Sequence, residues 1–280
     1  MAWDLDRRAA SRPIASQPRA HGQVQVSTKL CGRKTVLDRL HQHGSAKALF
    51  PREPGLDLTV VLLNTAGGVT GGDRFRTEAD AARGTSLTLA TQTAERAYRA
   101  QPGETGRLEN HLNVRSAARL DWLAQETILY QGARLDRRLT ADVAPDATFL
   151  AVETLIFGRT AMGERLSDIT LLDTWRIRRG GDLVYADALR LDGDAEEILG
   201  GRGTLNGARA LSSLVFVSPE AAYNLARLRH VLPPTAGASL IREGVLTARL
   251  LAEDCFTLRR SLIPVLACLR TAPLPKVWTI

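Results

Sequence analysis

The stretch LDLTVVLLNTAGGVTGGD, residues 56–73, joins an apolar run to a cluster of glycines. The run Leu56–Leu63 is rich in β-branched and aliphatic residues over the length of one strand, which predicts a buried β-strand. Glycines crowded directly after a strand predict a tight loop in which at least one of them adopts a positive φ. The residues of this predicted structural loop are Gly67, Gly68, Gly71, Gly72 and Asp73.

The glycine loop does not have the sequence of a phosphate-binding loop. It lacks the Lys-Ser/Thr pair that would bind phosphate and magnesium, and it continues into another predicted strand instead of a helix. Its spacing also differs from the GxGxxG of dinucleotide-binding proteins. We therefore expect a structural role, in which the Asp73 carboxylate closes the turn by accepting hydrogen bonds from main-chain N–H groups.

Segments with strand character recur after the loop at intervals of roughly 8–12 residues, a spacing typical of all-β proteins. No long helical segment separates them, which argues against a doubly wound parallel sheet. The sequence therefore predicts a layered or barrel-like, β-dominated domain over residues 22–280, preceded by a flexible tail at residues 1–21. The predicted strands are Phe75–Ala79, Ser86–Thr91, Leu108–Val114, Arg119–Leu123, Thr127–Tyr130, Arg137–Val143, Thr148–Leu155, Leu166–Trp175, Asp182–Leu191 and Gly237–Leu250.

Two helices are expected, both in the C-terminal half of the chain. The first, Ala221–Leu232, follows a Ser-Pro-Glu start signal and ends before two prolines. The second, Glu253–Leu269, has apolar residues near helical spacing, and Pro264 should break or kink it. The apolar side of the first helix is either core or a partner surface, with Arg227 and Arg229 beside it.

Composition narrows the class of protein. Hydrophobic residues make up 44% of the chain, and no apolar run approaches the roughly 20 residues that span a bilayer. The N-terminus does not resemble a secretory signal, so we expect a cytoplasmic protein. Three widely separated cysteines predict neither a disulfide framework nor a zinc site.

The formal net charge of +7 suggests an acidic partner. The arginines are scattered among acidic residues and aromatics are only 5% of the chain, a pattern unlike that of nucleic-acid-binding proteins. An acidic protein partner is therefore the better interpretation.

No residues form a recognisable catalytic set. The sequence has no GxSxG elbow, and nothing singles out a Ser/His/Asp or Cys/His arrangement. His41 and His43 would share one face of a strand and are weak candidates for metal binding. We expect no high-affinity metal site.

Two polar segments, Thr91–Arg99 and Trp122–Tyr130, lack a clean amphipathic period. They contain carboxylate and amide side chains that could bind a divalent cation weakly and release it. They could equally be strand and turn segments whose polar groups are paired with arginine.

Several segments resemble, in order, the motifs of the UreD (UreH) urease accessory proteins. GGVTGGD at residues 67–73 is similar to PGGxxGGD, with Ala66 in place of proline. Residues 91–99 resemble TTQxAxKxYR, with Arg96 in place of lysine, and residues 122–128 resemble WLPQExI, with Ala124 in place of proline.

The second half of the chain continues the resemblance. Glu153, Gly158-Arg159 and Gly163-Glu164 are similar to the E-x4-GR-x3-GE pattern of the family. Residues 236–239 resemble its AGAS, and residues 275–278 its terminal P-R/K-x-x-W. The resemblance therefore covers the chain from about Gly22 to its end.

The resemblance implies a β-rich layered fold with two helices and a non-catalytic chaperone for nickel insertion into urease. Its implied partners are the urease apoenzyme subunits, UreF and the GTPase UreG, without nucleic acid or membrane. It implies no permanently bound cofactor, only transient nickel. Residues expected to line a nickel route or to contact a partner are Asp73, Glu95, Arg96, Tyr98, Arg99, Gln125, Glu126, Glu153, Arg159 and Glu164.

Two other classes remain as alternatives. One is a hydrolase that uses carboxylates such as Asp73, Glu126 and Glu153 for acid–base catalysis. The other is a basic nucleic-acid-binding protein whose affinity falls steeply with salt. Neither accounts for the ordered motifs.

Overall fold

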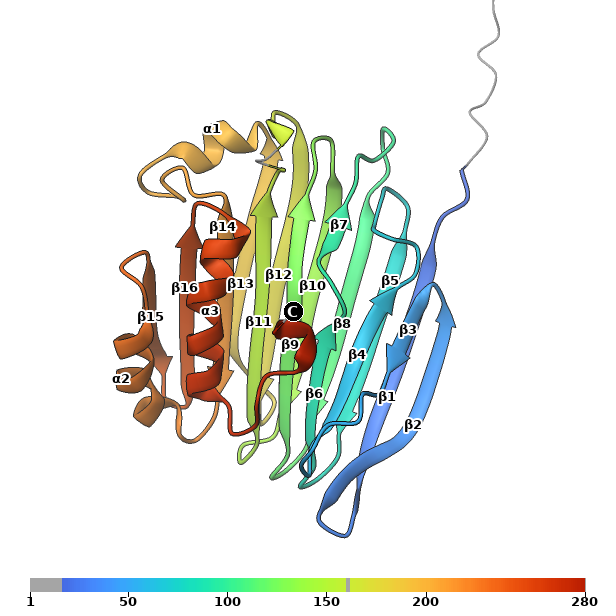
Figure 1. Ribbon diagram of the computed structural model, residues 1–280, viewed down its shortest axis with the longest axis vertical. Coiled ribbons are helices and arrows are strands. Elements are labelled where there is room, and N and C mark those ends of the chain that lie inside the picture. Colours follow the sequence, from blue (N-terminus) through green and yellow to red (C-terminus); the bar gives the residue numbers. More distant parts are fainter. Residues whose placement is uncertain (1–16, 160–161, 280) are drawn as a thin grey trace, which may run out of the picture.

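The computed structural model describes residues 17–159 and 162–279, which form two stacked β-sheets with two helices on the outer side of one sheet and a short helix at one end (Figure 1). In spatial order, sheet A consists of β13 (Asp182–Gly193), β12 (Ile169–Arg179), β10 (Arg134–Val143), β8 (Gly106–Val114), β5 (Arg74–Ala81), β1 (His21–Cys31) and β2 (Lys34–Gly44). Sheet B consists of β15 (Ala236–Arg242), β16 (Val245–Ala252), β14 (Ala210–Val217), β11 (Thr148–Phe157), β9 (Arg119–Leu129), β6 (Ser86–Thr91), β4 (Leu58–Asn64) and β3 (Ala46–Leu49), with β7 (Glu95–Ala97) also paired to β9. The β-dominated, layered fold predicted from the sequence is confirmed.

The chain alternates between the two sheets from β4 to β12, apart from the short β7. Successive strands of one sheet are therefore separated by a strand of the other, and they pair in parallel. Strands that follow each other within one sheet, such as β1 and β2 or β12 and β13, pair antiparallel. Parallel pairing thus arises here without the crossover helices of a doubly wound fold.

The space between the sheets is apolar at both ends and polar in the middle. One buried cluster gathers around Trp122, Phe149 and Trp175, and the other around Leu135 and Phe157. Two adjacent strands of sheet A and one strand of sheet B each carry a charged side chain at the inward position between the two clusters. These side chains are Arg137 on β10, Glu153 on β11 and Asp173 on β12.

A second core lies on the outer face of sheet B, under α2 (Ala221–Val231) and α3 (Cys255–Leu269). Figure 1 shows α3 and the C-terminal turn η2 (Lys276–Trp278) in front of this sheet. Leu262 and Leu266 of α3 are buried here, as is Trp278, whose Nε1 donates to the Leu123 carbonyl oxygen at 3.1 Å. None of the helices in the described residues has the length and apolarity that a membrane span requires.

Several local predictions need correction. Residues 1–16 of the predicted tail lie outside the described residues, and β1 already begins at His21. The segments predicted at Arg119–Leu123 and Thr127–Tyr130 form the single strand β9, and Gly237–Leu250 forms two strands. A third, short helix, α1 (Ala195–Gly200), was not predicted.

Of the two outcomes expected for Pro264, a break or a kink in the second helix, the break does not occur. α3 runs from Cys255 to Leu269 with Pro264 inside it. Leu262, Val265 and Leu266 flank the proline and are buried against sheet B, so packing on both sides holds the helix together where one main-chain hydrogen bond is missing.

The glycine loop between β4 and β5 has the predicted backbone and the predicted closure. Gly67 and Gly72 have φ values of 79° and 84°. The Asp73 carboxylate accepts from the backbone N–H of Ala20 and of Thr70, both at 2.8 Å. Gly68 is needed for a different reason, because the loop lies against the Tyr98 ring at that position.

We predict that Gly68→Ala lowers stability. A Cβ at this position would overlap the Tyr98 ring and lie 2.8 Å from the Arg96 carbonyl oxygen. Overpacking of this kind costs about 1–3 kcal/mol, measurable as a lower midpoint in chemical denaturation. Gly203→Ala is the control, because its Cβ would meet no atom within 4 Å. Equal midpoints for the two variants would contradict this account of the loop.

Candidate functional site

Two cavities lie inside the sandwich and adjoin at its centre. The first, of about 150 Å³, reaches the surface beside the exposed residues of the segment Thr91–Arg96. The second, of about 130 Å³, reaches the surface near Arg249, on the side of β13 and β16. Arg137 and Glu153 line both cavities. Arg137 and Glu153 therefore form a wall common to the two cavities, which together are called the passage below.

An ion cluster occupies the junction of the cavities. The Arg137 guanidinium donates through Nε and Nη2 to the two Asp173 oxygens, at 3.1 and 2.6 Å, and through Nη1 to Thr127 Oγ1 at 3.1 Å. Glu153 Oε1 accepts from Trp122 Nε1 at 3.0 Å. Glu153 Oε2 lies 3.3 Å from Arg137 Nε yet accepts no hydrogen bond. One buried carboxylate oxygen is thus left facing the passage.

Strand register places these groups together. Arg137 and Asp173 are direct partners in the parallel pair β10–β12, so their side chains leave the sheet side by side. Glu153 lies where β9 and β11 change register, and Ala124 and Gln125 together stand opposite this one residue. The bulge is next to the Thr91–Arg96 segment, where the ladder between β9 and its neighbours is interrupted and the first cavity opens.

Burial decides the electrostatics of the cluster. Arg137 and Glu153 are each only 3% exposed. Burial raises the pKa of Glu153, and Asp173 adds to that effect, whereas Arg137 and the Trp122 hydrogen bond oppose it. Burial disfavours the charge of Arg137, but Asp173 and Glu153 together raise its pKa, so it stays a cation.

Glu95 stands near the surface end of the first cavity. Its carboxylate accepts from Asn64 Nδ2 at 3.1 Å, and Asn64 also donates to the Gly68 carbonyl oxygen. Burial raises the pKa of Glu95, and the Asn64 hydrogen bond partly offsets this. Arg96 and Gln125 also line this cavity. Four of the residues predicted from the motifs therefore share one cavity: Glu95, Arg96, Gln125 and Glu153.

Glu126 faces away from the passage. It pairs with Arg259 of α3 at 3.1 Å, and the same guanidinium donates to Gln125 Oε1 at 2.5 Å and stacks on Trp278. Gln125 Nε2 also donates to the Val277 carbonyl oxygen at 2.7 Å. The Gln-Glu motif therefore attaches α3 and the C-terminal turn to sheet B.

Tyr98, Arg159 and Glu164 form another structural chain at one end of the sandwich. Arg159 pairs with Glu164 at 2.8 Å and stacks on Tyr130, which packs edge-on against Tyr98. Glu164 also accepts from the Gln131 backbone N–H, and the hydrogen bonds from Arg159 lower its pKa. These contacts hold three loops together, and none of the three motif residues is among those that line either cavity.

Gly67 of the glycine loop lines the first cavity, whereas Asp73, Arg99, His41 and His43 line neither cavity. Asp73 is part of the glycine loop, and the Arg99 carbonyl oxygen accepts from Thr70 at the same end. His41 and His43 are exposed on β2, and the described residues contain no group of three side chains placed to bind a metal. The carboxylates required by the hydrolase alternative also do not share a cavity, because only Glu153 lines one.

Two residues at the junction, Arg137 and Asp173, lie outside the motifs, and Trp122 lies in a motif but is not among the residues predicted for the route. A signal was present, since Leu135-x-Arg137-x-Leu139 and Leu171-x-Asp173-x-Trp175 each place a charge at the inward position of an alternating strand. A charge at such a position predicts a buried ionic partner.

Comparison with known proteins agrees with the motifs. The family model of the UreD urease accessory protein matches residues 20–279. The urease accessory protein UreD of Ruegeria pomeroyi is 51% identical over 257 residues, which cover 92% of this chain and 100% of that protein. Those of Roseobacter denitrificans and Azorhizobium caulinodans are 46% and 42% identical, covering 94% of this chain and 96% and 97% of their own lengths. This chain belongs to the UreD family of urease accessory proteins.

Proposed function

We propose that this chain is a non-catalytic chaperone that delivers nickel to the urease apoenzyme, in a cytoplasmic complex with UreF and the GTPase UreG. Membership of the UreD family supports a role in urease maturation. The finer proposal, transfer of nickel through this chain, rests on the two adjoining cavities described above.

The observation that carries the proposal is the pair of adjoining cavities with Glu153 at their junction. A buried carboxylate oxygen without a hydrogen bond is costly unless it borders water or a cation. Glu95 provides a further carboxylate toward one surface end, and Asp187 provides one toward the other. A cation entering at either end would meet oxygen atoms along the way.

The donors along the passage suit transfer better than storage. They are carboxylate, hydroxyl and amide oxygens, and no histidine or cysteine of residues 17–159 and 162–279 lines either cavity. Oxygen ligands bind nickel less firmly than imidazole or thiolate does, so an ion held by them can move on. A tight site would retain the ion that the chain delivers.

We predict that Glu153→Gln lowers the nickel delivered to urease. Glutamine keeps the shape and can still accept from Trp122 Nε1, but it removes the negative charge that would stabilise a cation at the junction. Nickel per active site, measured by elemental analysis of urease matured with this variant, should fall severalfold.

The matched control is Glu109→Gln, which removes a carboxylate on β8 that lines neither cavity. It should leave nickel loading unchanged. Full nickel loading with Glu153→Gln, in a variant that still co-purifies with the urease complex, would refute passage through the junction.

We further propose that UreF binds the helix-bearing face. Ala221 and Leu228 of α2 are fully buried, so the apolar side of this helix is core and not a partner surface. Arg229 donates to the Ala238 carbonyl oxygen and supports β15. Arg227 and the aromatic ring of Phe256, which is 70% exposed, remain available to a partner.

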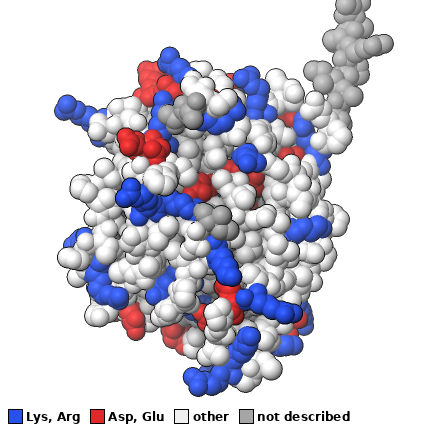
Figure 2. All heavy atoms as spheres, in the orientation of Figure 1, with Lys and Arg blue, Asp and Glu red and all other residues white. Residues whose placement is uncertain are grey.

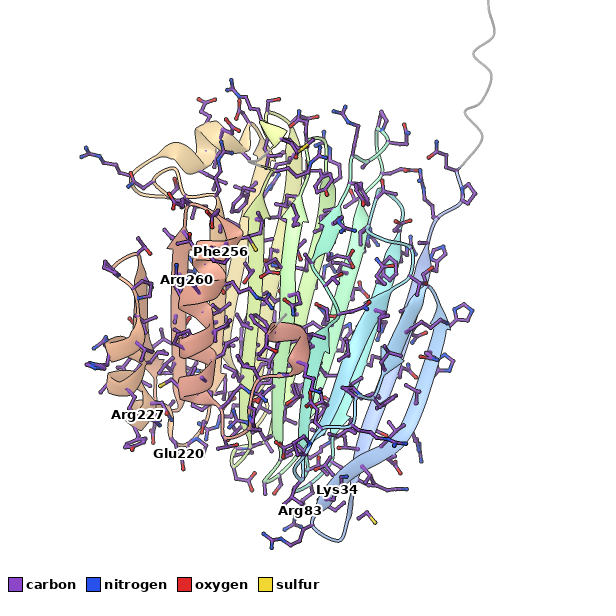
Figure 3. All side chains as sticks on the ribbon, viewed as in Figure 1. Lys34, Arg83, Glu220, Arg227, Phe256 and Arg260 are labelled. Atoms are coloured by element: carbon purple, nitrogen blue, oxygen red, sulfur yellow. The ribbon has the colours of Figure 1, made fainter. Side chains whose placement is uncertain are left out.

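The exposed groups of this face combine aromatic rings with cations. The Arg227 guanidinium lies over the Tyr223 ring, and the Arg260 guanidinium lies over the Phe256 ring. Figure 3 shows Phe256 and Arg260 on α3 and Arg227 on α2, all on the side that carries the helices. Figure 2 shows the basic side chains dispersed over this side, a pattern that suits a protein partner with several separate acidic groups.

Phe256→Ser and Arg227→Glu should each weaken co-purification with UreF without lowering the thermal midpoint of the isolated chain. The first removes an exposed aromatic anchor, and the second opposes an acidic partner. Arg39→Glu is the control, because Arg39 is exposed on β2 in sheet A. Unchanged UreF binding by both helix variants would place the contact elsewhere.

A further inference from the structure

Arg137 occupies the position where a cation in transit would have to pass. It lines both cavities, and its guanidinium holds both oxygens of Asp173 while lying 3.3 Å from Glu153. With both carboxylates ionised, the cluster carries two negative charges and one positive charge. The fixed cation would repel an arriving one, unless the guanidinium can leave the carboxylates.

The two cavities offer room for that movement. Their volumes, about 150 and 130 Å³, lie on either side of a side chain that has several rotatable bonds. The orphaned Glu153 oxygen also shows that the guanidinium does not satisfy the cluster completely. One acceptor is therefore ready for a ligand before Arg137 moves.

We infer that Arg137 is a tethered counter-ion that offsets one of the two negative charges of Asp173 and Glu153 while the passage is empty, and that a divalent cation displaces it. This inference rests on the proposed function and names a selectivity-determining residue within the same passage. Two buried carboxylates without a cation would be strongly unfavourable, so the empty passage needs a positive charge of its own.

The charge balance explains why the passage would select divalent cations over monovalent ones. A divalent cation neutralises both carboxylates at once, whereas a monovalent cation supplies only the charge that Arg137 already supplies. A monovalent ion would also have to replace a two-pronged, charge-assisted hydrogen bond and gain nothing in return. The tether in addition makes Arg137 a permanent competitor for the carboxylates, which weakens the hold on nickel and assists its release.

The test is the nickel affinity of the full-length chain with and without the competitor. Calorimetric titration of Arg137→Gln with Ni²⁺ should show binding at least about tenfold tighter than in the original chain, or about 1.4 kcal/mol. Arg137→Lys keeps the positive charge but loses the two-pronged hydrogen bond of the guanidinium. Its nickel affinity should therefore lie between those of the original chain and Arg137→Gln. Titration of Arg137→Gln with K⁺ should show no comparable gain.

A double variant and a stability measurement complete the design. Arg137→Gln with Asp173→Asn leaves Glu153 alone and should lose the tight binding. If Arg137→Gln does not fold without metal, recovery of its thermal transition with Ni²⁺ but not with K⁺ supports the inference, and recovery with neither contradicts it. Arg134→Gln, on the same strand with its ion pair to Asp168 outside the cavities, is the control for a lost arginine.

The results separate this inference from the proposed function. Equal nickel affinity in the original chain and in Arg137→Gln would overturn the counter-ion role, even if Glu153→Gln still lowers nickel in urease. If Arg137→Gln binds nickel more tightly but Glu153→Gln still gives fully loaded urease, the counter-ion role of Arg137 would be supported. The proposed route of nickel through the two cavities would then be refuted.

Discussion

The structure depends on one buried ion cluster, in which Arg137 is shared between Asp173 and Glu153. Removing Arg137 would leave two buried carboxylates uncompensated in a medium where water cannot solvate them, whereas removing one carboxylate leaves a neutral ion pair. The cluster also requires a single strand register, because a slip of one residue in β10 would turn Arg137 to the outer face of sheet A. The same three side chains divide the apolar interior into two clusters and leave the polar space between them.

The motif residues outside the passage explain how such a hollow sandwich stays ordered. Glu126 and Gln125 attach α3 and the C-terminal turn through Arg259, and the Arg159–Glu164 pair joins three loops at one end. Asp73 closes the glycine loop. Each of these polar groups is satisfied by a partner distant in sequence or by the backbone, so the motifs largely mark cross-links. Of the ten residues predicted to line a nickel route or contact a partner, four lie in the cavity wall: Glu95, Arg96, Gln125 and Glu153.

The first cavity opens at the place where the strand pairing of sheet B is irregular. The bulge at Ala124 and Gln125 and the gap between β6 and β7 lie side by side along β9. A regular ladder at this point would close the sheet over the first cavity. The interruption thus provides access to the interior while the remaining strands keep their pairing, and the proposed transfer of nickel needs both.

The sequence alone determined the class of fold, most strand and helix positions, the glycine loop and the family. These follow from local patterns: alternation, turn residues, cap signals and motif order are all written in neighbouring residues. It did not determine that Glu126 faces α3 while Glu153 faces the interior, nor that Pro264 stays inside a helix. Only tertiary structure decided these points, because the direction of a side chain at a bulge and the partner of a buried charge depend on strands that are distant in sequence. Arg137 and Asp173 are 36 residues apart along the chain, and strand register alone makes them one site.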